Sequence, residues 1–125
     1  MGAADPDFIV ELFSGFGRVA VRRMFSGAGV FADGLMIALV VDGVIYLKAD
    51  DGFIPLFERE GQVPFSYKTR DGRRTLMSYW RMPERLYDEP DELAQWARLA
   101  LQVAQRATAK PARGTKRARP SRKKR

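Results

Sequence analysis

The basic residues at the C-terminal end of the chain have the clearest chemical potential. Residues 106–125 contain ten Lys or Arg and no Asp or Glu. Lysine and arginine bind phosphate oxygens and release the counterions that surround a nucleic acid. The segment contains no aromatic residue, so it cannot stack on bases, and we expect nucleic-acid binding with little sequence preference. The predicted phosphate-contacting residues are Lys110, Arg113, Lys116, Arg117, Arg119, Arg122, Lys123, Lys124 and Arg125.

The rest of the chain has the opposite charge. Residues 1–105 hold twelve basic residues against fifteen acidic ones, a net charge of −3, although the whole chain carries +7. The isoelectric point of about 10.1 therefore describes the C-terminal segment and not the body. We call residues 108–125 the basic tail. A solubilising role, or contact with an acidic protein or a membrane surface, is the alternative to nucleic-acid binding.

A second set of basic residues lies in predicted strands and hairpins that also contain Tyr46, Tyr67 and Tyr79. If these basic residues and tyrosines share one face of the sheet, that face would extend the contact of the tail with nucleic acid. The net charge of −3 favours the other interpretation, which is ordinary ion pairs and solvated strand faces. The basic residues concerned are Arg22, Arg23, Lys48, Arg73, Arg74 and Arg81.

Catalytic and metal-binding groups are scarce. The chain has no Cys and no His, which excludes disulfides, thiolate nucleophiles, histidine bases and Cys/His zinc sites. The neighbouring carboxylates Asp50–Asp51 and Glu58–Glu60 do not point at a common centre, and the glycines of residues 26–29 lack the spacing of a phosphate-binding loop. We therefore expect no enzymatic activity, no cofactor and no bound metal.

The chain also lacks the sequence features of export or membrane insertion. Acidic residues stand near the N-terminus, where a signal peptide would be positively charged. The longest apolar run, residues 35–41, is too short to cross a bilayer. The absence of cysteine is in keeping with a reducing compartment. The expected location is the cytoplasm, with no membrane partner.

Turn and capping signals predict the elements that position these groups. Asp5-Pro6 is typical of a helix start. Asp-Gly pairs at 33–34, 42–43 and 71–72 predict hairpin turns, and a fourth pair at 51–52 precedes a short helix with Phe53, Ile54 and Phe57 inward. The predicted strands are 19–25, 29–32, 35–41, 44–49, 65–69 and 74–81, with residues 26–29 as a loop.

The last element is the most strongly patterned. Acidic residues at 88–92 suit the positive end of a helix dipole. Apolar residues, with Trp96 among them, then recur at helical spacing until about Ala107. The predicted fold is a two-layer α+β domain over residues 1–107. Its antiparallel sheet, a meander plus a hairpin, packs against an N-terminal helix, a short middle helix and a long C-terminal helix. The tail has no hydrophobe larger than Ala and is expected to be disordered.

Five segments together resemble a known family. They are Arg22–Phe31 (RRMFSGAGVF), Asp33–Met36 (DGLM), Tyr46–Asp50 (YLKAD), Met77–Pro83 (MSYWRMP) and Trp96–Arg98 (WAR). In this order they are similar to the TfoX/Sxy N-terminal domain, over most of residues 7–105. Ser26 and Ile37 depart from the residues common there, and the basic tail stands where the full-length regulators carry a second, helical domain.

The resemblance implies a two-layer α+β fold and a bacterial, cytoplasmic regulator of natural competence. The full-length regulators act with the cyclic-AMP receptor protein at promoters, which implies a role in transcription. Two hypotheses follow. In the first, a non-enzymatic regulatory domain contacts a protein partner while the tail binds DNA or RNA. In the second, the domain is a protein–protein interaction module, possibly homodimeric, and the tail is incidental. A small-molecule sensor would require an apolar pocket with convergent polar groups.

Overall fold

A single antiparallel sheet and its helices make up the computed structural model, which describes residues 5–24 and 27–109. The strands are β1 (Ala20–Met24), β2 (Gly27–Ala32), β3 (Leu35–Val41), β4 (Val44–Lys48), β5 (Pro64–Thr69) and β6 (Gly72–Arg81). The helices are α1 (Pro6–Leu12), α2 (Ile54–Arg59) and α3 (Pro90–Ala109), with a short 3-10 helix, η1 (Glu84–Asp88). The predicted α+β class, with a meander, a hairpin and three helices, is confirmed.

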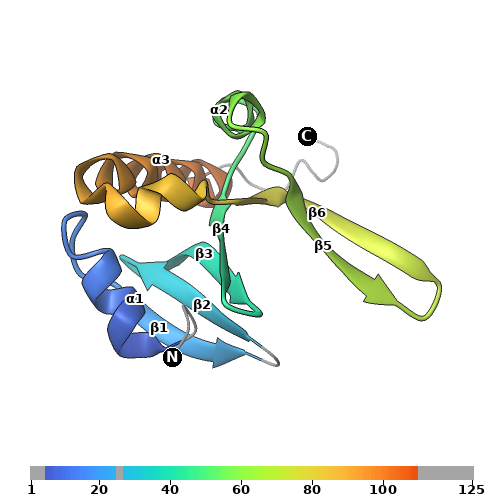
Figure 1. The fold of residues 1–125 in the computed structure, drawn as a ribbon, viewed down its shortest axis with the longest axis horizontal. Helices are drawn as coiled ribbons and strands as arrows, with labels where there is room; N and C mark the ends of the chain where they lie inside the picture. Colours follow the sequence, from blue (N-terminus) through green and yellow to red (C-terminus); the bar gives the residue numbers. More distant parts are fainter. Residues whose placement is uncertain (1–4, 25–26, 110–125) are drawn as a thin grey trace, which may run out of the picture.

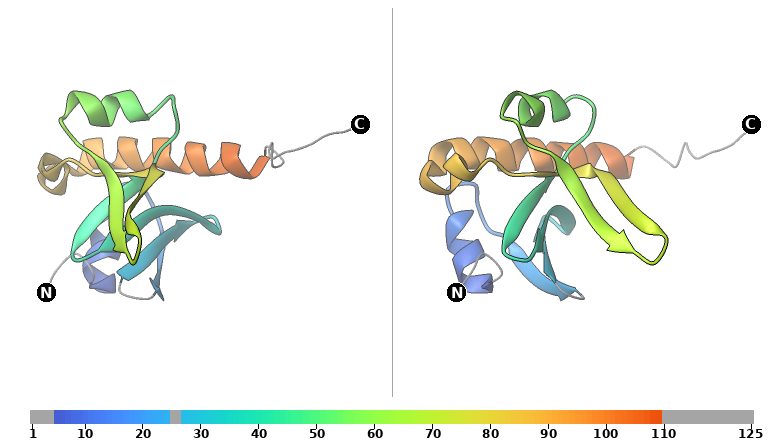
Figure 2. Two further views of the ribbon diagram at one scale, coloured as in Figure 1. Left: turned by 90° about the vertical axis from the view of Figure 1, so that its right-hand side faces the viewer. Right: turned by 45° about the vertical axis from the view of Figure 1, so that its right-hand side comes forward.

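The strands are ordered β1-β2-β3-β4-β6-β5 across the sheet, so the meander and the hairpin join through β4 and β6. Only Tyr79, Trp80 and Arg81 of the long strand β6 pair with β4. Residues 72–76 of β6 pair with β5 alone, and this hairpin projects from the body of the domain (Figure 1; Figure 2).

Two of the predicted hairpin turns have the expected backbone geometry. Asp33 and Gly34 have φ of 53° and 78°, and Asp42 and Gly43 have φ of 54° and 77°. Two consecutive positive φ angles match the right-handed twist of the flanking strands, which is why Asp-Gly is favoured there. At the third Asp-Gly pair, only Gly72 has a positive φ, of 129°, and it begins β6.

The prediction that residues 26–29 form a loop is wrong for the described part of that segment. Gly27, Ala28 and Gly29 belong to β2 and pair with both β1 and β3. The strands can approach here because glycine has no side chain. A Cβ atom on Gly27 would lie 2.0 Å from the carbonyl oxygen of Val40, and one on Gly29 would lie 2.8 Å from the sulfur of Met24.

One hydrophobic core joins the sheet to the helices. Residues from β2, β3 and β4 alternate inward, and Ala38, Val40, Ile45 and Leu47 are fully buried. Helix α3 covers these strands, and α1 contributes Ile9 and Phe13 to the same cluster. The predicted burial of Trp96 is confirmed at 5% exposure, and Trp80 at the end of β6 is 4% exposed.

Capping and packing account for the ends of the helices. The Asp5 side chain accepts a hydrogen bond from the Asp7 N–H at 3.0 Å and caps α1, as predicted. The acidic run at 88–92 is divided between the end of η1 and the first turn of α3. No helix within residues 5–24 and 27–109 is both long enough and apolar enough to cross a membrane.

Candidate functional site

The nine predicted phosphate-contacting residues, Lys110 to Arg125, lie outside the described residues. The last basic side chain before them is that of Arg106, near the end of α3, and it forms an ion pair within the domain. Its guanidinium donates to Asp50 Oδ2 from Nη2 at 2.8 Å and from Nε at 3.1 Å. Burial raises the pKa of Asp50, but the Arg106 contact and the Gly52 N–H outweigh it, so the pKa is lowered. Arg106 therefore joins the end of α3 to the loop after β4.

One row of paired residues crosses five strands on the face of the sheet opposite the buried residues. Directly paired residues in an antiparallel sheet project to the same side. The row, which we call the open face, consists of Arg22, Gly29, Leu39, Tyr46 and Arg81. Leu39 and Tyr46 are half-buried, and Arg22 is exposed. Some of the predicted basic and aromatic residues thus share one face.

Cations lie over aromatic rings on this face. The Arg22 guanidinium is 5.0 Å from the centroid of the Phe31 ring, and Lys48 Nζ is 5.0 Å from the centroid of the Tyr79 ring. Burial lowers the pKa of Lys48 and raises the pKa of Tyr79. Both cations lie over rings of the sheet, although Arg22 remains exposed to solvent and Lys48 is half-buried.

The open face continues onto the projecting hairpin through aromatic contacts. The rings of Tyr46 and Phe65 meet edge to face at 4.9 Å between centroids. Phe65 in turn stacks on Tyr67 at 5.7 Å and 20°. Tyr67 is 42% exposed, whereas Phe65 is 9% exposed. We call residues 64–77 the arm; its exposed tyrosine is the outermost of three contacting aromatic rings.

The arm is basic on both faces. It contains Lys68, Arg70, Arg73 and Arg74 against the single acid Asp71, a net charge of +3. None of these four cations forms an ion pair with another residue in the described part of the chain. Because Tyr67 is paired with Arg74 and Lys68 with Arg73, these two pairs project to opposite sides.

The structure therefore divides the predicted set of six basic residues. Arg22, Arg81 and Arg74 lie on the side of the tyrosines, and Lys48 contacts Tyr79 there. Arg23 is paired with Ala28 on the opposite side of the sheet, and Arg73 donates to Ser66 Oγ at 3.1 Å on the opposite side of the arm. The sequence interpretation did not include Phe65, which joins the two aromatic regions; its alternation with Tyr67 was the available signal.

A cluster centred on Arg85 was also not predicted. The guanidinium contacts Glu60 at 2.7 Å, Glu92 at 2.8 Å and Glu89 at 3.0 Å, which ties the end of α2 to η1 and α3. Hydrogen bonds from Arg85 lower the pKa of Glu60 and hold the pKa of Glu92 at about 2. The three carboxylates are used to join elements of the fold, and this cluster has a structural role.

Arg85→Leu is expected to make the domain less stable at neutral pH, by an amount that shrinks in acid. Carboxylates with a lowered folded-state pKa stabilise the fold above their ordinary value near 4.5, and this contribution is lost as the pH falls toward about 2. Urea unfolding of both proteins at several pH values between about 2 and 7 measures the difference. Arg59→Leu on α2 is the matched control. If the difference in unfolding free energy between Arg85→Leu and wild type did not change with pH, the stabilising role assigned to the Arg85 ion pairs would be wrong.

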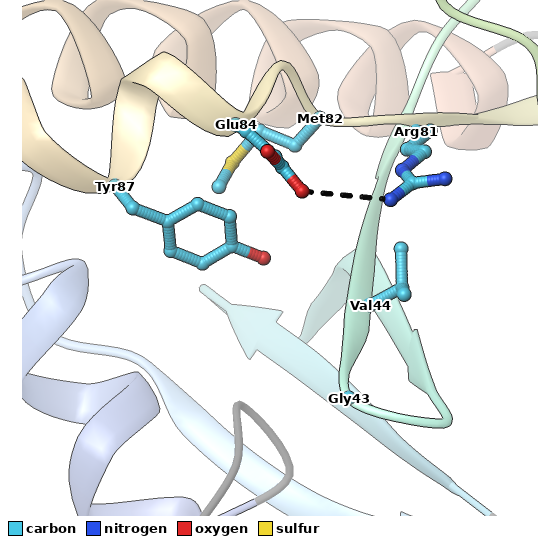
Figure 3. Close-up of a pocket in the computed structure, with 6 residues that line it drawn as sticks. All are labelled: Gly43, Val44, Arg81, Met82, Glu84 and Tyr87. Atoms are coloured by element: carbon cyan, nitrogen blue, oxygen red, sulfur yellow. Dashed lines mark ion pairs between the residues drawn. The ribbon is translucent and has the colours of Figure 1, made fainter.

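A shallow pocket beside the open face is shown in Figure 3. It is lined by Gly43, Val44, Arg81, Met82, Glu84 and Tyr87, with a volume of about 260 Å³. Arg81 and Glu84 face each other at 3.8 Å, and burial raises the pKa of the Tyr87 phenol. Its volume is below the roughly 300–1,000 Å³ of small-molecule sites, and its charges already pair with each other. The described residues contain no group of three or more acidic, His or Cys side chains placed to hold a metal ion.

The fold defines a two-layer α+β domain with helices on one side of a six-stranded antiparallel sheet. Comparison with known families identifies it further. The model of the TfoX N-terminal domain matches residues 11–104, so the chain belongs to the TfoX N-terminal domain family, as its sequence segments predicted. None of the curated proteins matches the chain.

Proposed function

We propose that this chain is a non-enzymatic regulatory protein of the TfoX type that acts in transcription in the bacterial cytoplasm, with competence as the regulated process. The folded domain contacts a protein partner. The basic tail binds nucleic acid with little sequence preference and holds the domain close to it. Affinity for nucleic acid and choice of partner then belong to different parts of the chain.

The division of charge between the two parts is the observation that carries this proposal. The tail contains nine basic residues and no acid, whereas residues 1–105 have a net charge of −3. Acidic residues gather where η1 meets α3, with Asp88, Glu89, Asp91 and Glu92 in sequence. A polyanion is attracted to the tail and repelled from this part of the domain.

Two exposed apolar side chains on α1 support a protein contact. Phe8 and Val10 are 41% and 43% exposed, although Ile9 between them is fully buried. Helix α1 thus presents apolar side chains to solvent as well as to the core. Large exposed hydrophobic side chains are favourable anchors for a partner.

The polar chemistry of the domain supports a binding role and not a catalytic one. Asp50, Glu60 and Glu92 are each bonded to an arginine, which lowers their pKa. A general acid at neutral pH needs a raised pKa instead. The chain has no histidine or cysteine to take that role, and these three carboxylates are held as ion-pair partners of arginine.

Binding of a labelled DNA duplex tests the proposal. Fluorescence anisotropy is measured with the full chain and with a chain that ends at Ala109, the last residue of α3. Loss of duplex binding on truncation is the expected result. Unchanged affinity would refute the role of the tail. A dimer that persists after truncation, detected by sedimentation, would favour the alternative of a homodimeric interaction module.

A further inference from the structure

We propose that the arm, residues 64–77, binds single-stranded nucleic acid, with one base stacked on Tyr67 and a neighbouring phosphate on Arg74. This inference rests on the nucleic-acid binding proposed above. It adds a second contact surface, the arm, and it states that this surface prefers single strands to duplexes. The tail offers cations for phosphates but no aromatic ring, whereas the arm offers both. Three features of the arm support this assignment.

The first feature is the position of the Tyr67 ring. Phe65 lies parallel to it within 20°, with 5.7 Å between the ring centroids, and so covers one side. Tyr67 still keeps 42% of its surface exposed. Phe65 is itself held by the edge of Tyr46. The exposed ring is thus supported by a packed aromatic row, so a base stacking on it does not have to order it first.

The second feature is the free space beyond Tyr67 toward the tip of the arm. The next pair on the same face is Thr69 and Gly72, in which Gly72 has no side chain. A Cβ atom on Gly72 would meet nothing within 4 Å. The Thr69 hydroxyl donates to the Gly72 carbonyl at 3.0 Å and is kept at the backbone. The neighbouring pair on this face therefore places no bulky side chain beside the ring, which favours the approach of a planar base from this side.

The third feature is the charge that surrounds the ring. Arg74 is paired directly with Tyr67, and Lys68, Arg70 and Arg73 lie within the same hairpin. These cations form no ion pair within the described residues, so phosphates need not displace a carboxylate to reach them. Uncompensated cations beside an exposed ring are complementary to a strand with unpaired bases.

The same charge disfavours a second copy of this chain as the occupant. β5 is an edge strand, and an edge is where two sheets can pair. Antiparallel pairing of two arms would bring a net charge of +3 against +3, and Lys68 lies on that edge. Like charges along paired strands are destabilising. A polyanion such as a nucleic-acid strand would instead be attracted to the positive charge of the arm, which favours it as the occupant.

The test uses the full chain and a labelled oligothymidylate of about 15 nucleotides, with the matching duplex measured beside it. Tyr67→Leu is expected to weaken single-strand binding about 5- to 100-fold and to leave duplex binding unchanged, because only unpaired bases can stack. Tyr67→Phe is expected to restore wild-type affinity, since it keeps the ring. Comparing the affinity for an oligouridylate of equal length shows whether the arm prefers single-stranded RNA or single-stranded DNA.

Two adjacent arginines provide a matched control for charge. Arg74→Gln is expected to weaken single-strand binding more than Arg73→Gln, although each removes one positive charge. Arg74 is on the face of Tyr67, whereas Arg73 is on the other face. Equal effects of the two variants would mean that net charge alone matters and would overturn the site.

The outcomes separate this inference from the role of the tail. Single-strand binding that depends on Tyr67 supports the arm even if truncation of the tail leaves duplex binding intact. Duplex binding that depends on the tail, together with equal single-strand affinity of wild type and Tyr67→Leu, overturns the arm and leaves the tail. If Tyr67→Leu abolishes a dimer in sedimentation while single-strand affinity is unchanged, the arm is a protein interface and the inference is wrong.

Discussion

Replacing Phe57 with alanine is expected to lower the free energy of unfolding by about 3–5 kcal/mol, the usual cost of removing a buried aromatic ring. Phe57 is fully buried, although it belongs to a helix of six residues. Its ring packs against those of Phe53 at 4.6 Å, Trp96 at 5.0 Å and Trp80 at 6.1 Å. One side chain thus joins α2 to α3 and to β6, and its loss leaves a cavity between them.

Urea unfolding measures this change, and the two tryptophans that contact Phe57 provide the fluorescence signal. Phe8→Ala is the matched control because Phe8 is 41% exposed on α1. It is expected to change the stability by less than about 1 kcal/mol. If the two variants were equally destabilised, the aromatic cluster would not be part of the cooperative core. A separate early transition would mean that α2 unfolds independently of the sheet.

Short-range signals determined the parts of the fold that the sequence predicts well. The β3 prediction, residues 35–41, agrees with the observed strand at both ends. Asp-Gly at 33–34 and 42–43 defines its two turns through backbone conformation alone, so no distant contact was needed. The amphipathic stripe of α3 likewise depends on neighbours three and four residues apart. Local physics is sufficient for such elements.

Segment 26–29 shows where local signals mislead. Its glycines suggest a loop, yet Gly27 and Gly29 lie in β2 and pair with both neighbouring strands. The backbone of β3 at Val40 is too close to Gly27 for a side chain there, and Met24, Met36 and Phe31 fill the space beside Gly29. That requirement comes from the pairing of β2 with its two neighbouring strands and not from the local sequence. The pairing of β4 with β6 is similar, since Tyr46 and Arg81 are far apart in sequence. The projection of the arm follows from this short pairing and has no counterpart in the local pattern.

The candidate site was predictable only in its composition. The types of residue, basic side chains next to tyrosines, are visible in the sequence. Their separation into two faces depends on strand register, which placed Arg74 beside Tyr67 and Arg73 behind it. Arg85 and Glu60 are 25 residues apart and meet only through the packing of α2 on η1. Contacts of this kind cannot be inferred from spacing.

The affinity of the full chain for a DNA duplex is expected to fall about 10³- to 10⁴-fold between about 50 and 200 mM salt. Each phosphate contact contributes about −0.9 to the slope of log affinity against log salt concentration. Six to eight contacts, made by the nine basic residues of the tail, give a slope of about −5 to −7. The measurement is anisotropy of a labelled duplex of about 20 base pairs across a salt series.

The folded domain by itself has too little positive charge to produce such a slope. A chain that ends at Ala109 has thirteen basic and fifteen acidic residues. It is therefore expected to lose the steep salt dependence together with duplex binding. Arg59→Gln combined with Arg98→Gln in the full chain removes two exposed cations from the helices α2 and α3 and should leave the slope unchanged. A slope that survives truncation, or that decreases in this double variant, would assign the duplex contacts to the domain. Because the tail is expected to bind phosphates with little sequence preference, a mixed-sequence duplex is a sufficient probe.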